Sequence, residues 1–223
     1  ALVAEAGKLQ HFAHPHIVDV FCVVTDRGNP SGFAMERLGD SLQAASSRGA
    51  LCWQRLEKAF GQLVEAVAHM HKLLIAHTDV KPANICFQSS CNFPVKLIDF
   101  DAAEKLKNSQ QCMHRLPGNL AAVSPERAEK LPCQFLGEDC FQVGWAFFSL
   151  TQNLPHDPAE GGELRARVQP LLHRAESRPN MQATLRRLGL QVAPEPGQLQ
   201  IQQNPTLLTS SPASDALTKL LGF

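Results

Sequence analysis

One long amphipathic segment, residues 51–74, limits what this chain can fold into more than any other feature. Apolar side chains recur there at spacings of three and four residues, at Leu56, Phe60, Leu63, Val67 and Met70. This period is typical of a helix that buries one face. Hydrophobic residues make up 44% of the 223-residue chain, which is enough for a sizeable core. We therefore predict a globular chain with a long helix over residues 51–74.

Shorter patterns predict the other elements. Strand-like composition occurs over residues 17–25, 32–38 and 95–100. The turn-forming residues 26–30 separate the first two of these, which predicts a hairpin. Apolar periodicity predicts further helices over residues 1–13, 140–150, 164–173 and 181–188. Residues 118–125 are predicted as a loop, and the Pro-, Gln-, Ser- and Thr-rich residues 193–213 as an extended tail.

Charge and cysteine content limit the classes of function. The 21 basic and 21 acidic residues give a formal net charge of zero, which offers no support for binding nucleic acid or a charged membrane surface. No apolar stretch reaches the ~18 residues that a membrane helix needs. None of the seven cysteines forms a Cys-x-x-Cys pair. We therefore expect reduced thiols in an intracellular, cytoplasmic protein rather than a zinc site.

The segment His77-Thr-Asp-Val-Lys-Pro-Ala-Asn84 follows the long helix and carries the polar residues of most interest. Asp79 and Asn84 are five residues apart, and Asp99 follows fifteen residues later at the end of an expected strand. Phosphoryl transfer needs one carboxylate to orient the attacking hydroxyl and accept its proton. It also needs oxygen ligands, such as a carboxylate and an amide, to hold Mg²⁺ against the phosphates. Each residue alone is more often a turn former, so the combination in this order carries the prediction.

The segment resembles the catalytic loop of eukaryotic-type protein kinases. The resemblance implies that Asp79 is the catalytic base and Lys81 the cation that faces the phosphates. It also implies that Asn84 and Asp99 are the Mg²⁺ ligands, and that ATP is the phosphoryl donor. The pair Lys81-Pro82 is similar to serine/threonine kinases rather than tyrosine kinases.

Further motifs of the same family follow in order. Ser124-Pro-Glu126 resembles the Ala-Pro-Glu motif, and Arg178 resembles the arginine that pairs with its glutamate, which implies a buried Glu126–Arg178 ion pair. Asp139 resembles the aspartate that anchors the catalytic loop from below. The resemblance also implies a stack of apolar side chains above Asp139, made of Leu9, Val20, His77 and Phe100.

The start of the chain resembles part of the family's small lobe. His14-Pro-His-Ile-Val18 is similar to the segment that follows the regulatory helix, and Glu5 lies nine residues before it. Residues 33–38 resemble the strand that runs into the hinge, with Met35 at the gatekeeper position. The nucleotide-binding residues implied by this resemblance are Glu5, Met35, Glu36, Leu38 and Cys86.

Three departures from the family pattern modify these expectations. The sequence begins within the helix that carries Glu5, without a Gly-rich loop or the strand with the ATP-contacting Lys, so we expect a fragment with weak or no catalysis by these 223 residues alone. Thr78 replaces an Arg that receives an activation-loop phosphate, so we expect any activity not to require that phosphorylation. Asp101 replaces the Gly of Asp-Phe-Gly, and we expect it to stiffen the loop or to add charge near the metal.

The predicted fold is α+β: a protein-kinase-like bilobal fold with a truncated small lobe and a mainly helical large lobe. Residues 1–38 would form the small-lobe remnant, residues 39–190 the large lobe and residues 191–223 a carboxy-terminal tail. The predicted function is an ATP- and Mg²⁺-dependent serine/threonine protein kinase acting on a protein substrate, without a nucleic-acid or membrane partner; the oligomeric state stays open. Two alternatives are a pseudokinase that serves as a scaffold and a small-molecule phosphotransferase of the aminoglycoside type, whose metal loop is similar to Leu-Ile-Asp-Phe-Asp.

Overall fold

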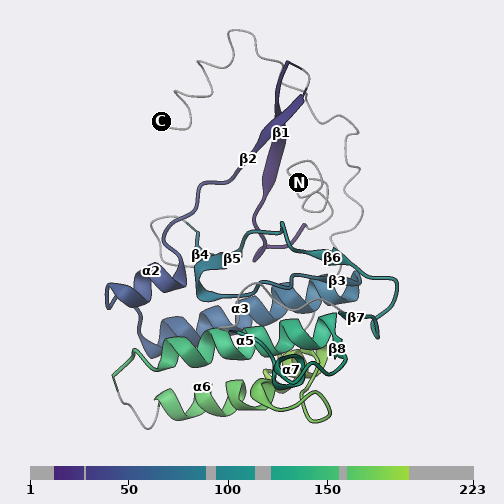
Figure 1. The fold of residues 1–223 in the computed structure, drawn as a ribbon. Coiled ribbons are helices and arrows are strands. Elements are labelled where there is room, and N and C mark those ends of the chain that lie inside the picture. Colours follow the sequence, from purple (N-terminus) through teal and green to yellow (C-terminus); the bar gives the residue numbers. More distant parts are fainter. Residues whose placement is uncertain (1–12, 28, 89–93, 114–121, 156–159, 191–223) are drawn as a thin grey trace.

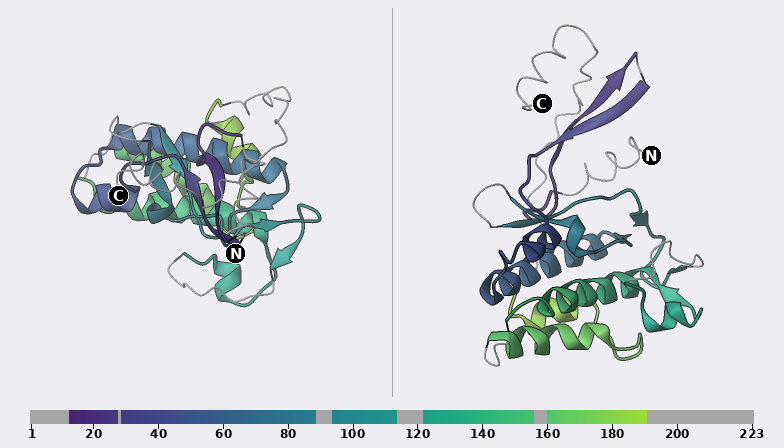
Figure 2. Two further views of the ribbon diagram at one scale, coloured as in Figure 1. Left: turned by 90° about the horizontal axis from the view of Figure 1, so that it is seen from above. Right: turned by 60° about the vertical axis from the view of Figure 1, so that its left-hand side comes forward.

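A computed structural model describes residues 13–27, 29–88, 94–113, 122–155 and 160–190 of the chain. Within them a two-stranded hairpin stands apart from a mainly helical body, as the views in Figures 1 and 2 agree. The predicted helix over residues 1–13, apart from its last residue, and the predicted tail over residues 193–213 lie outside the described residues. The architecture is an α+β arrangement of helices and small antiparallel sheets, as predicted.

The hairpin consists of β1 (Val20–Asp26) and β2 (Asn29–Met35), which pair antiparallel. The predicted hairpin is thus confirmed, although β2 begins and ends three residues earlier than expected. The turn is tighter than predicted because Asp26 already pairs with Asn29 and Arg27 takes a positive φ of 49°. The register shifts between Val20 and Cys22, as in a β-bulge, and Phe21 between them is 68% exposed.

The long helix is confirmed as α3 (Trp53–Lys72), whose buried residues form one continuous face. A shorter helix, α2 (Leu42–Ser47), precedes it and was not predicted. Ser41 caps α2, because its side chain accepts a hydrogen bond from the Ala44 amide at 3.1 Å. A six-residue helix has too few apolar positions to show a period, so its cap is its main sequence signal.

Three short antiparallel sheets and one 3₁₀ turn complete the described part of the body. The paired strands are β3 (Ile75–Ala76) with β6 (Glu104–Lys105), β4 (Ile85–Phe87) with β5 (Val95–Leu97), and β7 (Cys112–Met113) with β8 (Cys133–Gln134). The turn η1 (Pro82–Asn84) leads directly into β4. The strand predicted over residues 95–100 ends early because Asp99 takes a φ of 67°, which a regular ladder does not allow.

The remaining helices form the lower layers of the body in Figure 1. They are α4 (Pro125–Ala128), α5 (Phe135–Thr151), α6 (Glu160–Val168), η3 (Gln169–Leu172) and α7 (Met181–Arg187). The predicted helix over residues 164–173 is divided into α6 and η3 at Pro170, which lacks an amide hydrogen and is tolerated only near a helix start. The predicted helices over residues 140–150 and 181–188 are confirmed as α5 and α7.

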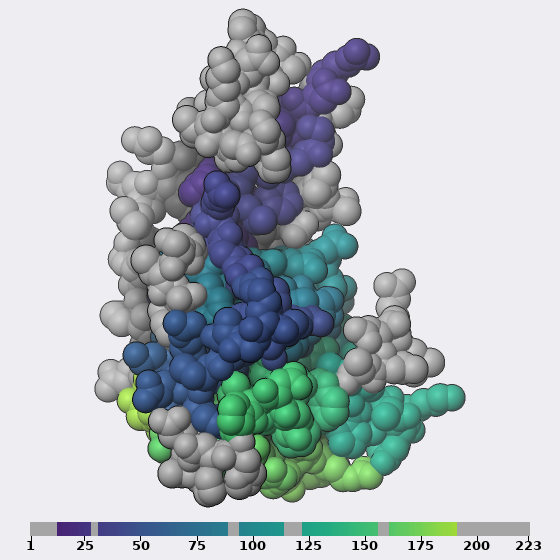
Figure 3. All heavy atoms as spheres, turned by 90° about the vertical axis from the view of Figure 1, so that its left-hand side faces the viewer, coloured from purple at the N-terminus to yellow at the C-terminus, as the bar shows by residue number. Residues whose placement is uncertain are grey.

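The core lies between α3 and α5. The rings of Phe60 and Phe147 meet edge to face there, with centroids 5.1 Å apart and no solvent exposure. Helix α5 also packs closely on η3, because Gly144 has no Cβ; a Cβ there would come within 2.7 Å of Leu171. In the space-filling view of Figure 3, the blue residues of the α2–α3 region lie directly against the green residues of α5 and α6. Among the described residues, no helix is both long and apolar enough to span a bilayer.

Candidate active site

Three of the predicted site residues meet in the loop between β3 and β4. One carboxylate oxygen of Asp79 lies 2.6 Å from the Lys81 ammonium nitrogen and accepts a hydrogen bond from the Asn84 side-chain amide at 3.2 Å. The same Asn84 amide donates to the Asp79 backbone carbonyl at 3.0 Å. The side chains of Asp79 and Lys81 are each 34% exposed, so a carboxylate and a cation are held together within reach of solvent.

Asp99 lies next to this loop. It follows β5, which pairs with β4, and the preceding Ile98 amide donates to the Asn84 carbonyl at 2.9 Å. Asp99 is exposed and adopts the left-handed conformation, which aspartate tolerates better than most residues. The turn out of β5 therefore presents the Asp99 carboxylate to solvent at the end of the strand beside Asn84.

The donor atoms in this region suit a hard cation. Asn84 points its amide nitrogen at Asp79, which turns its side-chain oxygen away from Asp79. That oxygen and the Asp99 carboxylate are ligands of the type that Mg²⁺ prefers, and Mg²⁺ bound with nucleotide phosphates uses only one or two protein ligands. Among the described residues no group of three His, Cys, Asp or Glu side chains could hold a metal ion by itself. The residues therefore fit Mg²⁺ bound together with phosphate, not a free-standing metal site.

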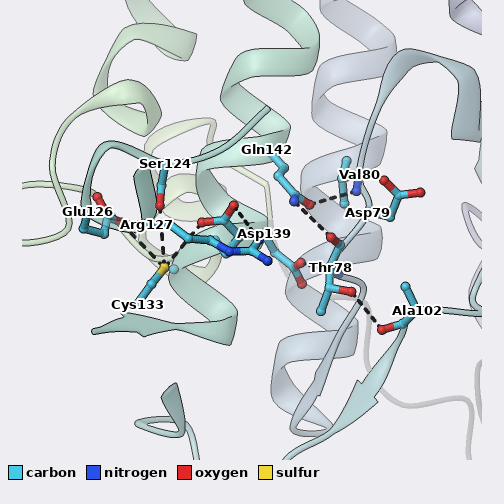
Figure 4. A network of polar contacts seen from close by, with 12 residues as sticks. Thr78, Asp79, Val80, Ala102, Ser124, Glu126, Arg127, Cys133, Asp139 and Gln142 are labelled. Carbon is cyan, nitrogen blue, oxygen red and sulfur yellow. Dashed lines mark hydrogen bonds and ion pairs between the residues drawn. The ribbon is translucent and has the colours of Figure 1, made fainter. Parts of the chain in front are cut away.

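Asp139 anchors the loop from α5, as predicted. Its carboxylate is fully buried and accepts hydrogen bonds from the backbone amides of His77 at 2.8 Å and Thr78 at 2.7 Å. It also lies 3.0 Å from Nε2 of His71 on α3. Figure 4 shows Asp139 beside Thr78 in the loop that carries Asp79. A buried carboxylate is stable only while its hydrogen-bond partners stay in place. Asp139 therefore ties the loop to α5, which carries it, and to α3, which carries His71.

His77 connects the loop to β5. Its ring is fully buried, lies 3.1 Å from the Ile98 carbonyl through Nε2, and meets the ring of Phe100 with centroids 4.9 Å apart. Burial lowers the pKa of His77, and the neighbouring carboxylates of Asp139, Asp79 and Asp99 only partly oppose that shift. The His77–Phe100 part of the predicted stack is therefore confirmed, whereas Leu9 lies outside the described residues.

Thr78 holds the loop against the segment that follows Asp99. Its hydroxyl donates to the Ala102 carbonyl at 2.8 Å (Figure 4). Its φ is 67°, a strained conformation for a β-branched residue. Sequence reasoning treated Thr78 only as the loss of an arginine and did not single out Gln142, whose side chain binds the same loop.

The predicted Glu126–Arg178 ion pair is confirmed. Two nitrogens of Arg178 donate to the two carboxylate oxygens of Glu126, at 2.6 Å and 3.1 Å, and the side chains are only 2% and 6% exposed. Burial alone would raise the pKa of Glu126, but the hydrogen bonds from Arg178 outweigh it and the pKa lies below its ordinary value. Arg178 also donates to the Gly137 carbonyl at 3.0 Å, so the pair fastens the α4 segment to the start of α5.

A second ion pair, not predicted, lies beside the first. Arg127 donates to the fully buried Glu138 at 3.0 Å. The Cys133 thiol donates to the other Glu138 oxygen at 3.3 Å and lies 3.6 Å from the Ser124 hydroxyl (Figure 4). Burial raises the pKa of Cys133 to about 12, so this thiol stays protonated and acts as a hydrogen-bond donor rather than a nucleophile.

Four of the five predicted nucleotide-binding residues, Met35, Glu36, Leu38 and Cys86, lie in or beside the segment that links β2 to α2. This segment runs along β4, because the Gly39 amide donates to the Phe87 carbonyl at 2.7 Å. Leu38 packs partly buried against the core, and Cys86 is buried in β4, where burial raises the pKa of its thiol. Met35 at the end of β2 is 41% exposed. The structure thus places Cys86 in the strand that begins after Asn84, and Leu38 in the segment that runs along this strand.

Glu36 contacts other residues of the protein through its side chain and its backbone. Its carboxylate lies 2.5 Å from the ammonium nitrogen of Lys96, and its backbone amide donates to the Asp19 carbonyl at 3.0 Å. Its amide and its carboxylate are therefore both engaged in contacts within the protein. Glu5, also predicted to contact the nucleotide region, lies outside the described residues.

A pocket of about 770 Å³ lies elsewhere in the body. Its walls include His71, Gln110, Cys140, Arg178 and Met181, and none of the four residues predicted to carry the chemistry lines it. We therefore place the candidate active site by its chemical groups rather than by cavity size.

The comparisons with known proteins agree on one family. The family model described as the protein kinase domain matches residues 1–221. Among curated proteins, the chain is similar to CBL-interacting protein kinase 15 of Oryza sativa subsp. japonica, with 28% identity over 76% of this chain and 39% of that protein. It is also similar to the probable serine/threonine-protein kinase mkcD of Dictyostelium discoideum, with 29% identity over 64% of this chain and 21% of that protein.

A third relative extends the comparison to yeast. The chain is 31% identical to serine/threonine-protein kinase PRR1 of Saccharomyces cerevisiae, over 61% of this chain and 29% of that protein. The chain therefore spans between 21% and 39% of the length of these three relatives.

Proposed function

The chain belongs to the protein kinase domain family, and from that premise we propose that it transfers the γ-phosphoryl group of ATP to a serine or threonine hydroxyl of a protein substrate. The observation that carries the proposal is the Asp79 carboxylate, which is held by Lys81 and Asn84 beside an exposed Asp99. The names of the relatives as serine/threonine kinases support the choice of acceptor.

Asp79 and Lys81 act on the reacting groups. Asp79 orients the substrate hydroxyl and accepts its proton as the hydroxyl oxygen forms a bond to phosphorus. The bond between that phosphorus and the departing ADP oxygen breaks in the same displacement. Lys81, 2.6 Å from Asp79, offers positive charge to the transferred phosphoryl oxygens. Little covalent chemistry falls to the protein, so the fixed positions of these two side chains account for most of their effect.

Asn84 and Asp99 would hold the magnesium ion, and the residues in and beside β4 would hold the nucleotide. Mg²⁺ bound there would neutralise phosphate charge. Asn84 offers its side-chain oxygen and Asp99 its carboxylate, both from positions fixed by the pairing of β4 with β5. Met35, Leu38 and Cys86 contribute the apolar surroundings of the adenine, and the backbone of the segment from Glu36 to Leu38 contributes polar groups.

Two matched substitutions in the protein test the proposal. Asp79→Asn should lower kcat for phosphorylation of a protein substrate by roughly 10²–10⁴-fold. It should leave the thermal stabilisation by Mg²⁺–ATP intact. Asp99→Asn should abolish that stabilisation, which amounts to ~2.7 kcal/mol for a ligand at a hundredfold excess over its Kd. Asp26→Asn, at an exposed position in β1, serves as the control and should change neither quantity.

The outcomes separate three readings of the chain. Stabilisation by Mg²⁺–ATP with transfer that depends on Asp79 supports the proposal. Stabilisation without any transfer would replace it with a pseudokinase that binds nucleotide. Transfer to a small-molecule hydroxyl but to no protein would replace it with a small-molecule phosphotransferase. The absence of both stabilisation and transfer in the folded full-length protein would contradict it altogether.

A further inference from the structure

Gln142 on α5 forms hydrogen bonds with the backbone on both sides of Asp79. Its side-chain oxygen accepts a hydrogen bond from the Val80 amide at 2.9 Å, and its side-chain nitrogen donates to the Thr78 carbonyl at 3.0 Å. Gln142 is only 5% exposed. Figure 4 shows its side chain reaching from the helix to the loop between these two residues. The only residue between the two contact points is Asp79.

Gln142 and Asp139 bind different backbone groups of the loop. They lie three residues apart on α5 and therefore share one face of that helix. Asp139 accepts from the amides of His77 and Thr78, before Asp79. Gln142 binds Thr78 and Val80, on either side of Asp79. The helix thus fixes the approach to Asp79 through Asp139 and the two peptide groups that flank Asp79 through Gln142.

The residue type at position 142 matches this task. The Thr78 carbonyl needs a donor and the Val80 amide needs an acceptor, and a side-chain amide supplies both from one planar group. An ionised carboxylate supplies only acceptors, and an aliphatic or thioether side chain of the same length supplies no donor. Thr78 also adopts a φ of 67°, which a β-branched residue keeps only when its surroundings hold it there.

We propose that Gln142 is a positioning residue for the reaction: its amide fixes the peptide groups around Asp79 and so sets the direction in which the Asp79 carboxylate points. This inference rests on the proposed function, because it assigns Gln142 an effect on proton acceptance by Asp79. Gln142 itself touches neither substrate nor nucleotide. A displacement of a reacting group by about 1 Å can cost on the order of 10²-fold in rate, so a loosened loop would reduce turnover strongly.

The test compares Gln142→Met with wild type in the full-length protein. Methionine keeps the length and apolar stem but cannot donate to Thr78. We expect kcat to fall by about 10²-fold while the KM for ATP stays within about twofold. In an Asp79→Asn background, Gln142→Met should cause no further loss of kcat, because the two residues act as one unit. A purely structural role would instead give the same fractional loss in both backgrounds.

Two further variants keep the test decisive. Gln182→Met removes a comparable amide, which donates to the Ala68 carbonyl of α3 at 3.0 Å rather than to the loop that carries Asp79, and should lower the melting temperature without lowering kcat. If Gln142→Met does not fold, Gln142→Asn takes its place: it stays polar but is one methylene too short to reach both partners, and it should lower kcat in the same direction.

Each outcome bears on a defined claim. Wild-type kcat in a folded Gln142 variant, or equal losses in the two backgrounds, would overturn the positioning role and leave the proposed function intact. A wild-type protein that shows no phosphotransfer at all would overturn the proposed function, and the positioning role with it. A loss of kcat that disappears in the Asp79→Asn background supports both.

Discussion

The Glu126–Arg178 pair shows what a single buried contact contributes at the residue scale. Both side chains are almost inaccessible, and Arg178 satisfies both oxygens of Glu126. Replacing one partner would leave the other charge buried without compensation, which costs far more than the pair contributes relative to an apolar isostere. The pair therefore acts mainly to fix the α4 segment against α5 in one arrangement.

Arg178→Met should lower the free energy of unfolding by roughly 3–5 kcal/mol, because Glu126 would remain buried without its donor. Urea unfolding at neutral pH, followed by circular dichroism, measures this change. Arg174→Met is the matched control, since Arg174 pairs with Glu129 at the exposed surface and solvent screens such a pair. Equal destabilisation by the two substitutions would show that the burial of Glu126 has no special consequence.

At the scale of elements, the segment before β1 is held against α3 by a cluster of histidines. The His14 ring stacks on His69 of α3 with centroids 5.0 Å apart, and it accepts a hydrogen bond from the His16 amide at 3.1 Å. His16 in turn lies 3.7 Å from Glu65 of α3. Burial, followed by the nearby His69, His16 and Lys96, lowers the pKa of His14 to about 3. Burial also lowers the pKa of His16.

This cluster predicts a loss of stability in mild acid. The unfolded chain binds a proton at His14 below about pH 6.5, whereas the folded chain does so only near pH 3. The contribution of neutral His14 to the free energy of unfolding is therefore complete above pH 6.5. It is lost as the pH falls toward 3, by at most ~1.4 kcal/mol per pH unit for one histidine. Unfolding free energies of wild type and His14→Asn over this range test it, and the variant should show the shallower slope. His173→Asn, at an exposed histidine, should keep the wild-type slope; identical slopes in all three proteins would refute the prediction.

The same scale shows which elements and contacts can be predicted from sequence. Helix α3 was predictable because its apolar period runs over twenty residues, whereas α2 is too short to show one. Asp79, Lys81 and Asn84 could be singled out together because they lie in one short motif that resembles the catalytic loop of protein kinases. The two hydrogen bonds of Gln142 join residues 62 and 64 positions apart, and nothing in the local pattern of either segment indicates them.

At the scale of the whole molecule, Lys96 joins the hairpin to the helical body. Its side chain is 4% exposed and lies 2.8 Å from Asp19, just before β1, and 2.5 Å from Glu36, just after β2. Burial alone would lower the pKa of Lys96, but these two carboxylates hold it above its ordinary value. Lys96 itself lies in β5, three residues before Asp99. One cation therefore ties both ends of the hairpin to the strand that leads to the proposed metal ligand.

Lys96→Met should loosen the hairpin without unfolding the body. The substitution leaves Glu36 largely buried without its cation. Among the strands that the structure describes, β1 and β2 pair only with each other, so no other sheet holds the hairpin in place. Amide hydrogen exchange should become at least about tenfold faster in β1 and β2, which corresponds to ~1.4 kcal/mol of local stability, and should change little in α3. Lys105→Met is the control, because Lys105 lies in β6 and donates to the Leu73 carbonyl at 2.7 Å within the body. Faster exchange throughout α3 as well would mean that Lys96 supports the whole fold. Unchanged exchange in β1 and β2 would contradict the prediction, because the hairpin would then not depend on Lys96.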